Sequence, residues 1–226
     1  MEKNKTNITN FKGFDCGSLN LISGVRAMGL TSLVVNIAGK SQAKKVLYFA
    51  LEEMKEHIDD RLEKINSSSE NIEIIDDVND IESISEIIRN SSDIDMVVID
   101  KLSLIEAENR ETVVLKLKEL ASKQNVAIIV TNTIPRMINY REDKRPKLDD
   151  TIKLNRYCDK VIYLYRDEYY NADYVKNGNE LGVSYLPQYS KTLPSVDVEL
   201  IVAKDNSDTS QKIINVHFDR AKGNYF

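Results

Sequence analysis

Short runs of apolar residues alternate along the chain with longer segments whose apolar residues recur every three or four positions. The short runs, which we expect to be strands, are residues 19–23, 46–50, 72–75, 96–100, 127–132 and 161–165. Their nearly continuous apolar character is typical of parallel strands buried on both faces. The longer segments 29–39, 80–89 and 110–123 predict amphipathic helices; Asp80 is the expected N-cap of the second, and Asn109 precedes the third. This alternation predicts an α/β fold with a mainly parallel central sheet flanked by helices.

The end of the chain follows a different pattern. Residues 196–204 and 212–218 predict two strands joined by a short polar turn, which is typical of a β-hairpin at the edge of a sheet. Residues 171–195 contain Gly, Asn and Pro breakers and predict an extended loop. No internal linker is visible. We therefore expect one domain, residues 19–226, after an N-terminal extension of residues 1–18.

Composition narrows the classes of protein. The chain has 226 residues, of which 42% are hydrophobic and 30% charged, enough for a sizeable core and unlike a disordered chain. Its net charge of −5 gives no bulk electrostatic reason to bind nucleic acid. The chain has two cysteines and two histidines, too few to favour a zinc cluster or a Ser-His-Asp catalytic site. The first residues lack the apolar core of a signal peptide, and no apolar run approaches the roughly 18 residues of a membrane span. These features predict a cytoplasmic protein without membrane contact.

Residues 23–33, SGVRAMGLTSL, lie between the first expected strand and helix, which is where a phosphate-binding loop occurs. The pattern G-x-x-x-x-G-K-[ST] is matched in register by Gly24, Gly29, Thr31 and Ser32, while Leu30 stands at the lysine position. Backbone N–H groups at a helix start can hold phosphates whatever residue occupies position 30. Leucine nevertheless removes a charge-assisted hydrogen bond worth about 1.5–3 kcal/mol. The loop alone therefore leaves open whether it binds a nucleotide or is only the scaffold of such a site.

Two acidic residues follow buried strands. Asp100 ends the run 96–100, the position from which a Walker-B carboxylate holds Mg²⁺ through water. Glu52 follows the second strand and could orient an attacking water molecule. An acid favoured by the dipole at a helix start explains Glu52 equally well on its own.

Several stretches together carry a family resemblance. In chain order they are NLISGVRAMGLTSLVVNIA, KKVLYFALEEM, DMVVIDKLSLI, LKLKELASKQNVAIIVTN, REDKRPKLDD, VIYLYRDEYYN and ELIVAKDN. From about residue 11 onward the chain resembles the C-terminal motor domain of bacterial replicative helicases of the DnaB type, and DKRP followed by YRDEYY is the most specific feature. The resemblance implies a RecA-like P-loop ATPase domain that uses ATP and Mg²⁺ and works in a hexameric ring.

The resemblance also implies roles for individual residues. Thr31, Glu52 and Asp100 match the family's magnesium-binding threonine, catalytic glutamate and Walker-B aspartate, and Lys204 matches a lysine that reaches the neighbouring subunit's site. Leu30, Asn132 and Asn206 stand where the family has the loop lysine, a glutamine that senses the γ-phosphate and a trans-acting arginine. An arginine finger alone is worth about 10³–10⁵ in rate, or about 4–7 kcal/mol. Losing it together with the loop lysine predicts turnover near zero.

A basic segment, residues 135–147, lies where the family places a DNA-facing loop. It contains Arg136, Arg141, Lys144, Arg145 and Lys147 against Glu142 and Asp143. Contact with single-stranded DNA and an ordinary solvated loop are equally consistent, and a single domain would bind DNA weakly because affinity grows with the number of phosphates neutralised. Seven of the eleven tyrosines lie between Tyr163 and Tyr189, where packing is favoured over stacking on bases.

Three functions are consistent with these residues. The first is a non-catalytic accessory or regulator of DNA replication, which caps, loads or inhibits a replicative helicase, acts with another replication protein, or serves a phage or mobile element. The second is an active ATP-dependent helicase or translocase in which another cation, such as Arg26 or one from a partner subunit, replaces the lysine. The third is a switch that binds ATP without hydrolysing it. The sequence shows no match to the family's N-terminal domain and linker helix, so we expect a monomer or dimer rather than a stable hexamer.

Overall fold

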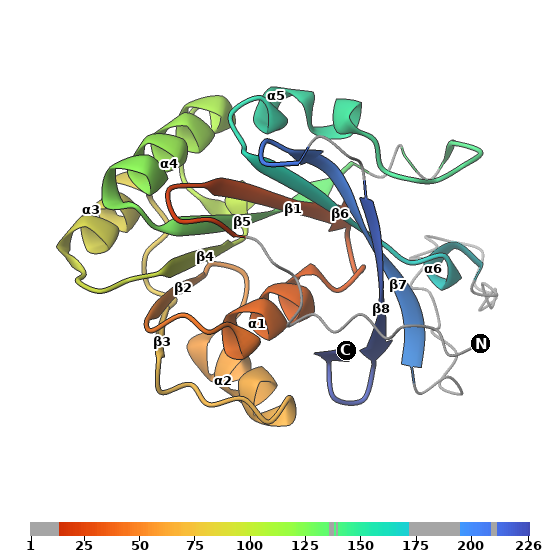
Figure 1. The fold of residues 1–226 in the computed structure, drawn as a ribbon, viewed down its shortest axis with the longest axis horizontal. Helices are drawn as coiled ribbons and strands as arrows, with labels where there is room; N and C mark the ends of the chain where they lie inside the picture. The colour runs from red at the N-terminus through yellow and green to blue at the C-terminus, as the bar shows by residue number, and fades with distance from the viewer. Residues whose placement is uncertain (1–13, 136–137, 139, 172–194, 209–211) are drawn as a thin grey trace, which may run out of the picture.

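The structure, a computed structural model, describes residues 14–135, 138, 140–171, 195–208 and 212–226 (Figure 1). Within these residues, nine strands form one sheet in the order β3-β2-β4-β5-β1-β6-β7-β8-β9. The strands are β1 Leu19–Val25, β2 Val46–Ala50, β3 Ile72–Ile75, β4 Met96–Asp100, β5 Ala127–Ile134, β6 Lys160–Tyr165, β7 Ser195–Asp205, β8 Lys212–Asp219 and β9 Asn224–Tyr225. The α-helices are α1 Leu30–Lys40, α2 Lys55–Lys64, α3 Ile81–Asn90, α4 Arg110–Gln124, α5 Ile152–Asn155 and α6 Glu168–Asn171. Short 3-10 turns occur at η2 Leu102–Leu104 and η4 Leu148–Thr151.

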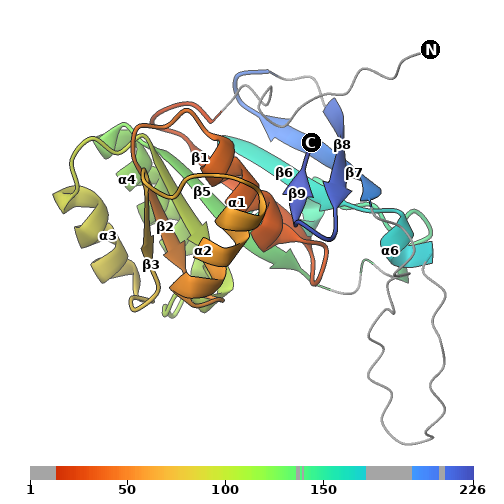
Figure 2. The same ribbon diagram turned by 90° about the horizontal axis from the view of Figure 1, so that it is seen from below.

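Helices cover both faces of the sheet. Helices α1 and α2 pack on one face and α3 and α4 on the other, as Figures 1 and 2 show. Strand β1 illustrates why its sequence is apolar throughout, because Ile22 enters the core beneath α1 while Leu21 enters the core beneath α4. All seven residues of β1 are buried. Burial on both faces removes the polar alternation of a half-exposed strand.

The sheet is parallel from β3 to β6 and antiparallel from β6 to β9. This arrangement confirms the predicted α/β fold with a mainly parallel sheet and a C-terminal hairpin, since β7 pairs with both β6 and β8. The hairpin is followed by β9, which pairs with the end of β8. The loop predicted at 171–195 lies almost entirely outside the described residues.

Helix α2 and strand β9 were not predicted from the sequence. Helix α2, KEHIDDRLEK, buries only Ile58 and Leu62, so its apolar periodicity is too sparse to indicate a helix. Strand β9 has two residues. Both elements border the candidate site, so the sequence did not predict that part of the site.

Candidate functional site

The turn between β1 and α1 has the backbone shape of a phosphate-binding loop. Gly29 precedes the helix with φ 101° and ψ 30°, in the left-handed region that favours glycine. A Cβ atom at this position would lie 2.9 Å from the hydroxyl oxygen of Tyr225, so a larger residue would also collide with the end of the chain. No side chain caps the start of α1. The first N–H groups of the helix therefore have no partner from a capping side chain and are available to a ligand.

Leu30 is part of the hydrophobic core and not of the loop's polar lining. Its exposed fraction is 7%. Its Cδ2 atom and the side chain of Leu164 both lie 3.4 Å from the point where a Cβ on Gly24 would stand. The leucine therefore fills an apolar space, and the loop contributes no cation at this position.

Thr31 and Asp100 come together at the start of α1. Asp100 ends β4 and is 2% exposed. Its carboxylate accepts hydrogen bonds from the hydroxyl of Thr131 and, at 3.4 Å, from that of Tyr48, and the Thr31 hydroxyl lies near enough to help lower its pKa. Burial raises the pKa of Asp100, and the threonine hydroxyls partly oppose that shift. A hydroxyl and a carboxylate are ligands that Mg²⁺ accepts, so these two residues fit a magnesium ion that accompanies a nucleotide.

Glu52 lies beside Asp100 because the ends of β2 and β4 are tied together. The backbone N–H groups of Leu51 and Glu52 donate to the Asp100 carbonyl at 2.7 and 3.2 Å. The Glu52 carboxylate forms an ion pair with Lys101, with Nζ and Oε2 2.6 Å apart. Sequence reasoning missed Lys101, although a basic residue directly after the Walker-B acid was the available signal.

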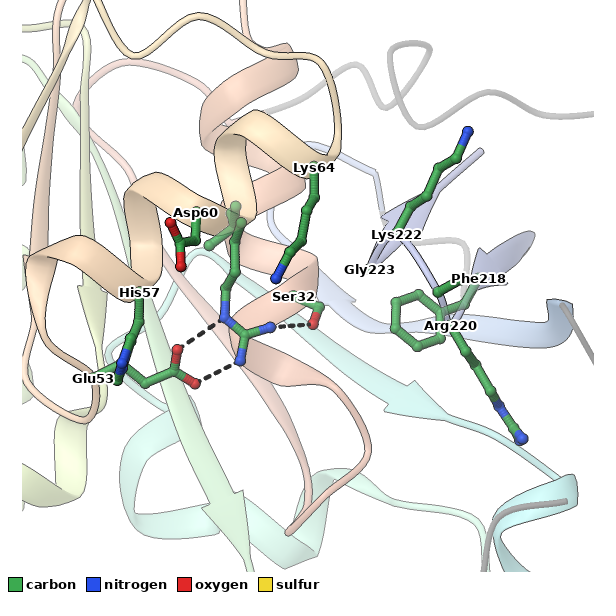
Figure 3. Close-up of a pocket in the computed structure, with 12 residues that line it drawn as sticks. Ser32, Glu53, His57, Asp60, Lys64, Phe218, Arg220, Lys222 and Gly223 are labelled. Carbon is green, nitrogen blue, oxygen red and sulfur yellow. Dashed lines mark hydrogen bonds and ion pairs between the residues drawn. The ribbon is translucent and has the colours of Figure 1, made fainter. Parts of the chain in front are cut away.

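A cavity of about 520 Å³ adjoins the loop (Figure 3). Its walls are formed by α1, α2, Glu53 and the turn between β8 and β9. The charged residues that line it are Glu53, Asp60, Arg61, Lys64, Arg220 and Lys222. Arg61 crosses between two walls, donating to both carboxylate oxygens of Glu53 at 2.8 and 2.7 Å and to the Ser32 hydroxyl at 3.2 Å. Four cationic side chains against two anionic ones favour an anionic ligand.

The end of the chain is fastened to α1 by Asn36, which is fully buried. The Asn36 amide donates to the carbonyls of Ser32 and Gly223 at 2.8 and 2.7 Å, and its oxygen accepts from the Tyr225 N–H at 3.0 Å. The Tyr225 hydroxyl donates to the Gly29 carbonyl at 3.3 Å. We call this set of contacts the C-terminal clasp. It positions one wall of the cavity, and no pattern in the sequence indicates it.

The remaining residues matched to the family's site are Lys204, Asn206 and Asn132. They lie on strands or directly after them, and Lys204 and Asn206 form hydrogen bonds within the chain. Lys204 donates to the carbonyls of Asn155 and Cys158 at 3.0 and 2.6 Å. Asn206 donates to the Asp159 carboxylate at 3.3 Å. Asn132 lies on β5 opposite Ser23 of β1 and is partly exposed.

The basic segment predicted to face DNA makes contacts within the chain, except for Arg136, which lies outside the described residues. Arg141 pairs with Asp150 at 2.9 and 2.5 Å, Arg145 pairs with Glu199 through both guanidinium nitrogens, and Lys147 pairs with Asp143 at 2.8 Å. Lys144 lies 5.4 Å from the ring centre of Tyr170, and Arg145 lies 4.6 Å from that of Tyr165. DNA binding by these residues stays a prediction.

Three of the clustered tyrosines, Tyr163, Tyr165 and Tyr169, are buried and contribute to packing. No helix among the described residues has the length and apolar character needed to cross a membrane. In the same part of the chain, no group of three or more His, Cys, Asp or Glu side chains is arranged to hold a metal ion.

Comparisons with known proteins identify similar chains. The family model of the DnaB-like helicase C-terminal domain matches residues 63–225. The replicative DNA helicase DnaB of Geobacillus stearothermophilus is 32% identical over 136 residues, which cover 55% of this chain and 30% of that relative. A solved ATPase domain superposes with a TM-score of 0.76 at 22% identity and covers 93% of this chain and 84% of that one. A DnaB-like replicative helicase, solved in a study of its interactions with primase, superposes with a TM-score of 0.73 at 23% identity over 94% of this chain and 59% of that one.

Proposed function

Since this chain belongs to the family of DnaB-like helicase C-terminal domains, we propose that it acts in DNA replication as an accessory or regulator that does not turn over ATP. Its expected partner is a replicative helicase or another replication protein, with single-stranded DNA as a possible second partner. The chain spans less than a third of the Geobacillus relative's length, so the relative's helicase activity is not carried over to it.

The single observation that carries the proposal is the state of Leu30. A buried leucine that belongs to the same hydrophobic cluster as Leu164 offers no charge to the outer phosphates of a nucleotide. Neutralising the transferred phosphoryl group is the main task of a protein in phosphoryl transfer, because the transition state needs little covalent help. A loop without its cation supports binding through backbone groups better than it supports turnover.

Lys204 and Asn206 add to this argument. The ammonium of Lys204 is bound by two carbonyls of its own chain, and Asn206 replaces a cationic residue with a neutral one. A neighbouring subunit that packed against β7 would therefore receive little positive charge from these positions. This lack of charge supports a protein that is a monomer or dimer. It also supports a subunit that binds to a helicase without contributing to ATP hydrolysis in it.

Phosphate release from ATP tests the proposal directly. We expect the purified protein with Mg²⁺, with or without single-stranded DNA, to release phosphate no faster than its Asp100→Ala variant, which lacks the magnesium-binding carboxylate. Release that is robust and is lost in Asp100→Ala would refute the absence of turnover. As a matched control, Asp95→Ala changes the acid directly before the same strand, where its carboxylate accepts from the Lys44 N–H.

An active helicase or translocase is the second candidate, because Thr31, Glu52 and Asp100 all lie around the start of α1. These residues fit a magnesium ion and a water-orienting carboxylate. Stimulation of ATP hydrolysis by single-stranded DNA distinguishes the two candidates, since an accessory without turnover has no hydrolysis to stimulate.

A further inference from the structure

Lys101 places an ammonium group at a site whose loop lacks one. It directly follows Asp100, and its Nζ lies 2.6 Å from the Glu52 carboxylate. The Lys101 side chain is 12% exposed, whereas that of Glu52 is 37% exposed. Lys101 is therefore the more buried partner of this ion pair.

The neighbours of this ion pair connect it to the loop. The hydroxyl of Thr31, the residue directly after Leu30, lies near the Asp100 carboxylate and helps to lower its pKa. Asp100 directly precedes Lys101, and its carbonyl accepts from the Glu52 N–H at 3.2 Å. The Lys101 ammonium is thus part of the same small cluster as the hydroxyl and carboxylate that fit Mg²⁺.

Arg26, within the loop, is exposed, and two other cations near the loop are more firmly engaged. Arg61 binds both oxygens of Glu53 and the Ser32 hydroxyl. Arg166 is 4% exposed and donates to the Met28 carbonyl and to Glu168. Lys101 instead makes a single-atom ion pair at the end of a flexible four-carbon stem, so it can exchange one oxygen partner for another.

We propose that Lys101 supplies the cation that the phosphate-binding loop lacks, by binding the outer phosphates of a nucleoside triphosphate in place of a lysine at position 30. On entry of the triphosphate with Mg²⁺, the ammonium exchanges the Glu52 carboxylate for a phosphate oxygen. The inference rests on the nucleotide site of the proposed function. Once Lys101 takes the place of the loop lysine, the absence of turnover rests on Asn206, which is neutral, and on Lys204, whose ammonium is bound by carbonyls of its own chain.

Titration of the full chain with a fluorescent ATP analogue and Mg²⁺ tests this assignment. We expect Lys101→Met to weaken binding by about 10–100-fold, the loss of one charge-assisted hydrogen bond, and Lys101→Arg to retain most of the affinity. Adding Leu30→Lys to Lys101→Met should restore binding, because the loop then carries the cation itself. Lys116→Met, which removes a surface lysine paired with Glu82, is the matched control and should bind like the native protein.

A double variant separates phosphate contact from simple charge repulsion. If Lys101→Met binds weakly only because Glu52 is left unpaired, then Glu52→Gln combined with Lys101→Met will bind normally, and the assignment is overturned. If the double variant remains weak, the ammonium itself is required. Thermal unfolding of each variant checks that the fold is intact.

The outcomes also separate this inference from the proposed function. Native protein that fails to bind the analogue, or Lys101→Met that binds as tightly as native protein, overturns the role of Lys101 and leaves a non-hydrolysing accessory possible. Robust hydrolysis overturns the accessory without turnover, while the role of Lys101 is still judged by the binding titration alone.

Discussion

Replacing Asn36 with alanine should release the C-terminal clasp and destabilise the protein. The side chain is fully buried and links α1 to the turn before β9 and to β9 itself. Alanine removes every one of these side-chain contacts while keeping the helix backbone. The perturbation is therefore confined to the clasp.

The size of the effect follows from the groups left behind. The Tyr225 N–H is buried, and losing its acceptor costs about 1–3 kcal/mol. The Gly223 carbonyl is only partly buried, so the loss of its donor costs about 0.5–1.5 kcal/mol. The Ser32 carbonyl lies within α1 and keeps its helical partner. Alanine recovers roughly 0.5 kcal/mol of helix propensity, which leaves a net loss of about 1–4 kcal/mol.

Urea unfolding followed by circular dichroism measures this loss, which suits a chain without tryptophan. The matched control is Asn71→Ala, which removes one partly buried amide that donates to the Ala43 carbonyl at 2.8 Å. We expect the control to lose about 0.5–1.5 kcal/mol. The reasoning would be refuted if Asn36→Ala lost no more stability than Asn71→Ala, because the clasp would then contribute nothing beyond one ordinary hydrogen bond.

Asp100→Asn should raise the free energy of unfolding at neutral pH, because burial raises the pKa of the native carboxyl and the unfolded chain carries the charge more easily. This gain should disappear as the pH falls to the unfolded pKa of about 3.9, so a gain that persists unchanged at lower pH would contradict the cause. Arg145→Met should lower the free energy of unfolding by about 0.5–2 kcal/mol, through loss of the Glu199 ion pair and the ring contact. Because Arg145 already has an anionic partner, the salt dependence of binding to single-stranded DNA should not change; a slope lowered by about 0.7 would show a phosphate contact instead. Cys16 is exposed and should react with a thiol reagent at pH 8, whereas Cys158 is 1% exposed with its pKa raised by burial to about 12, so a second thiol should react only after unfolding in urea. Rapid reaction of both thiols in the native protein would show that Cys158 is accessible.

The central sheet could be predicted because each strand is indicated by apolar residues that are adjacent in the sequence. Strands β2, β3 and β4 have the bounds that the apolar runs indicated. Helix α3 begins after Asp80, whose side chain accepts from the Ser83 N–H as an N-cap should. Strand β9 could not be predicted in this way, since two residues form a strand only because Asn36 and the end of β8 hold them.

The candidate site was predicted only where motif spacing determines it. The loop pattern and the strand-ending acid located Thr31 and Asp100, whose side chains lie near one another in the structure. The pairing of Lys101 with Glu52 depends on which strands are neighbours, and that of Arg145 with Glu199 depends on the path of the loop over β7. Counting charges in the sequence shows that cations are present, but not which carboxylates they contact.

The clasp also has a consequence for the order of events during synthesis. Asn36 and Tyr225 are 189 residues apart, so a ribosome that adds about 5–20 residues per second makes α1 about 10–40 s before β9. During that interval the nascent chain has the loop but not the cavity wall that the turn before β9 provides. A ligand that needs this wall cannot bind and guide the folding of the growing chain. The site is completed only when β9 has been translated and has docked on Asn36.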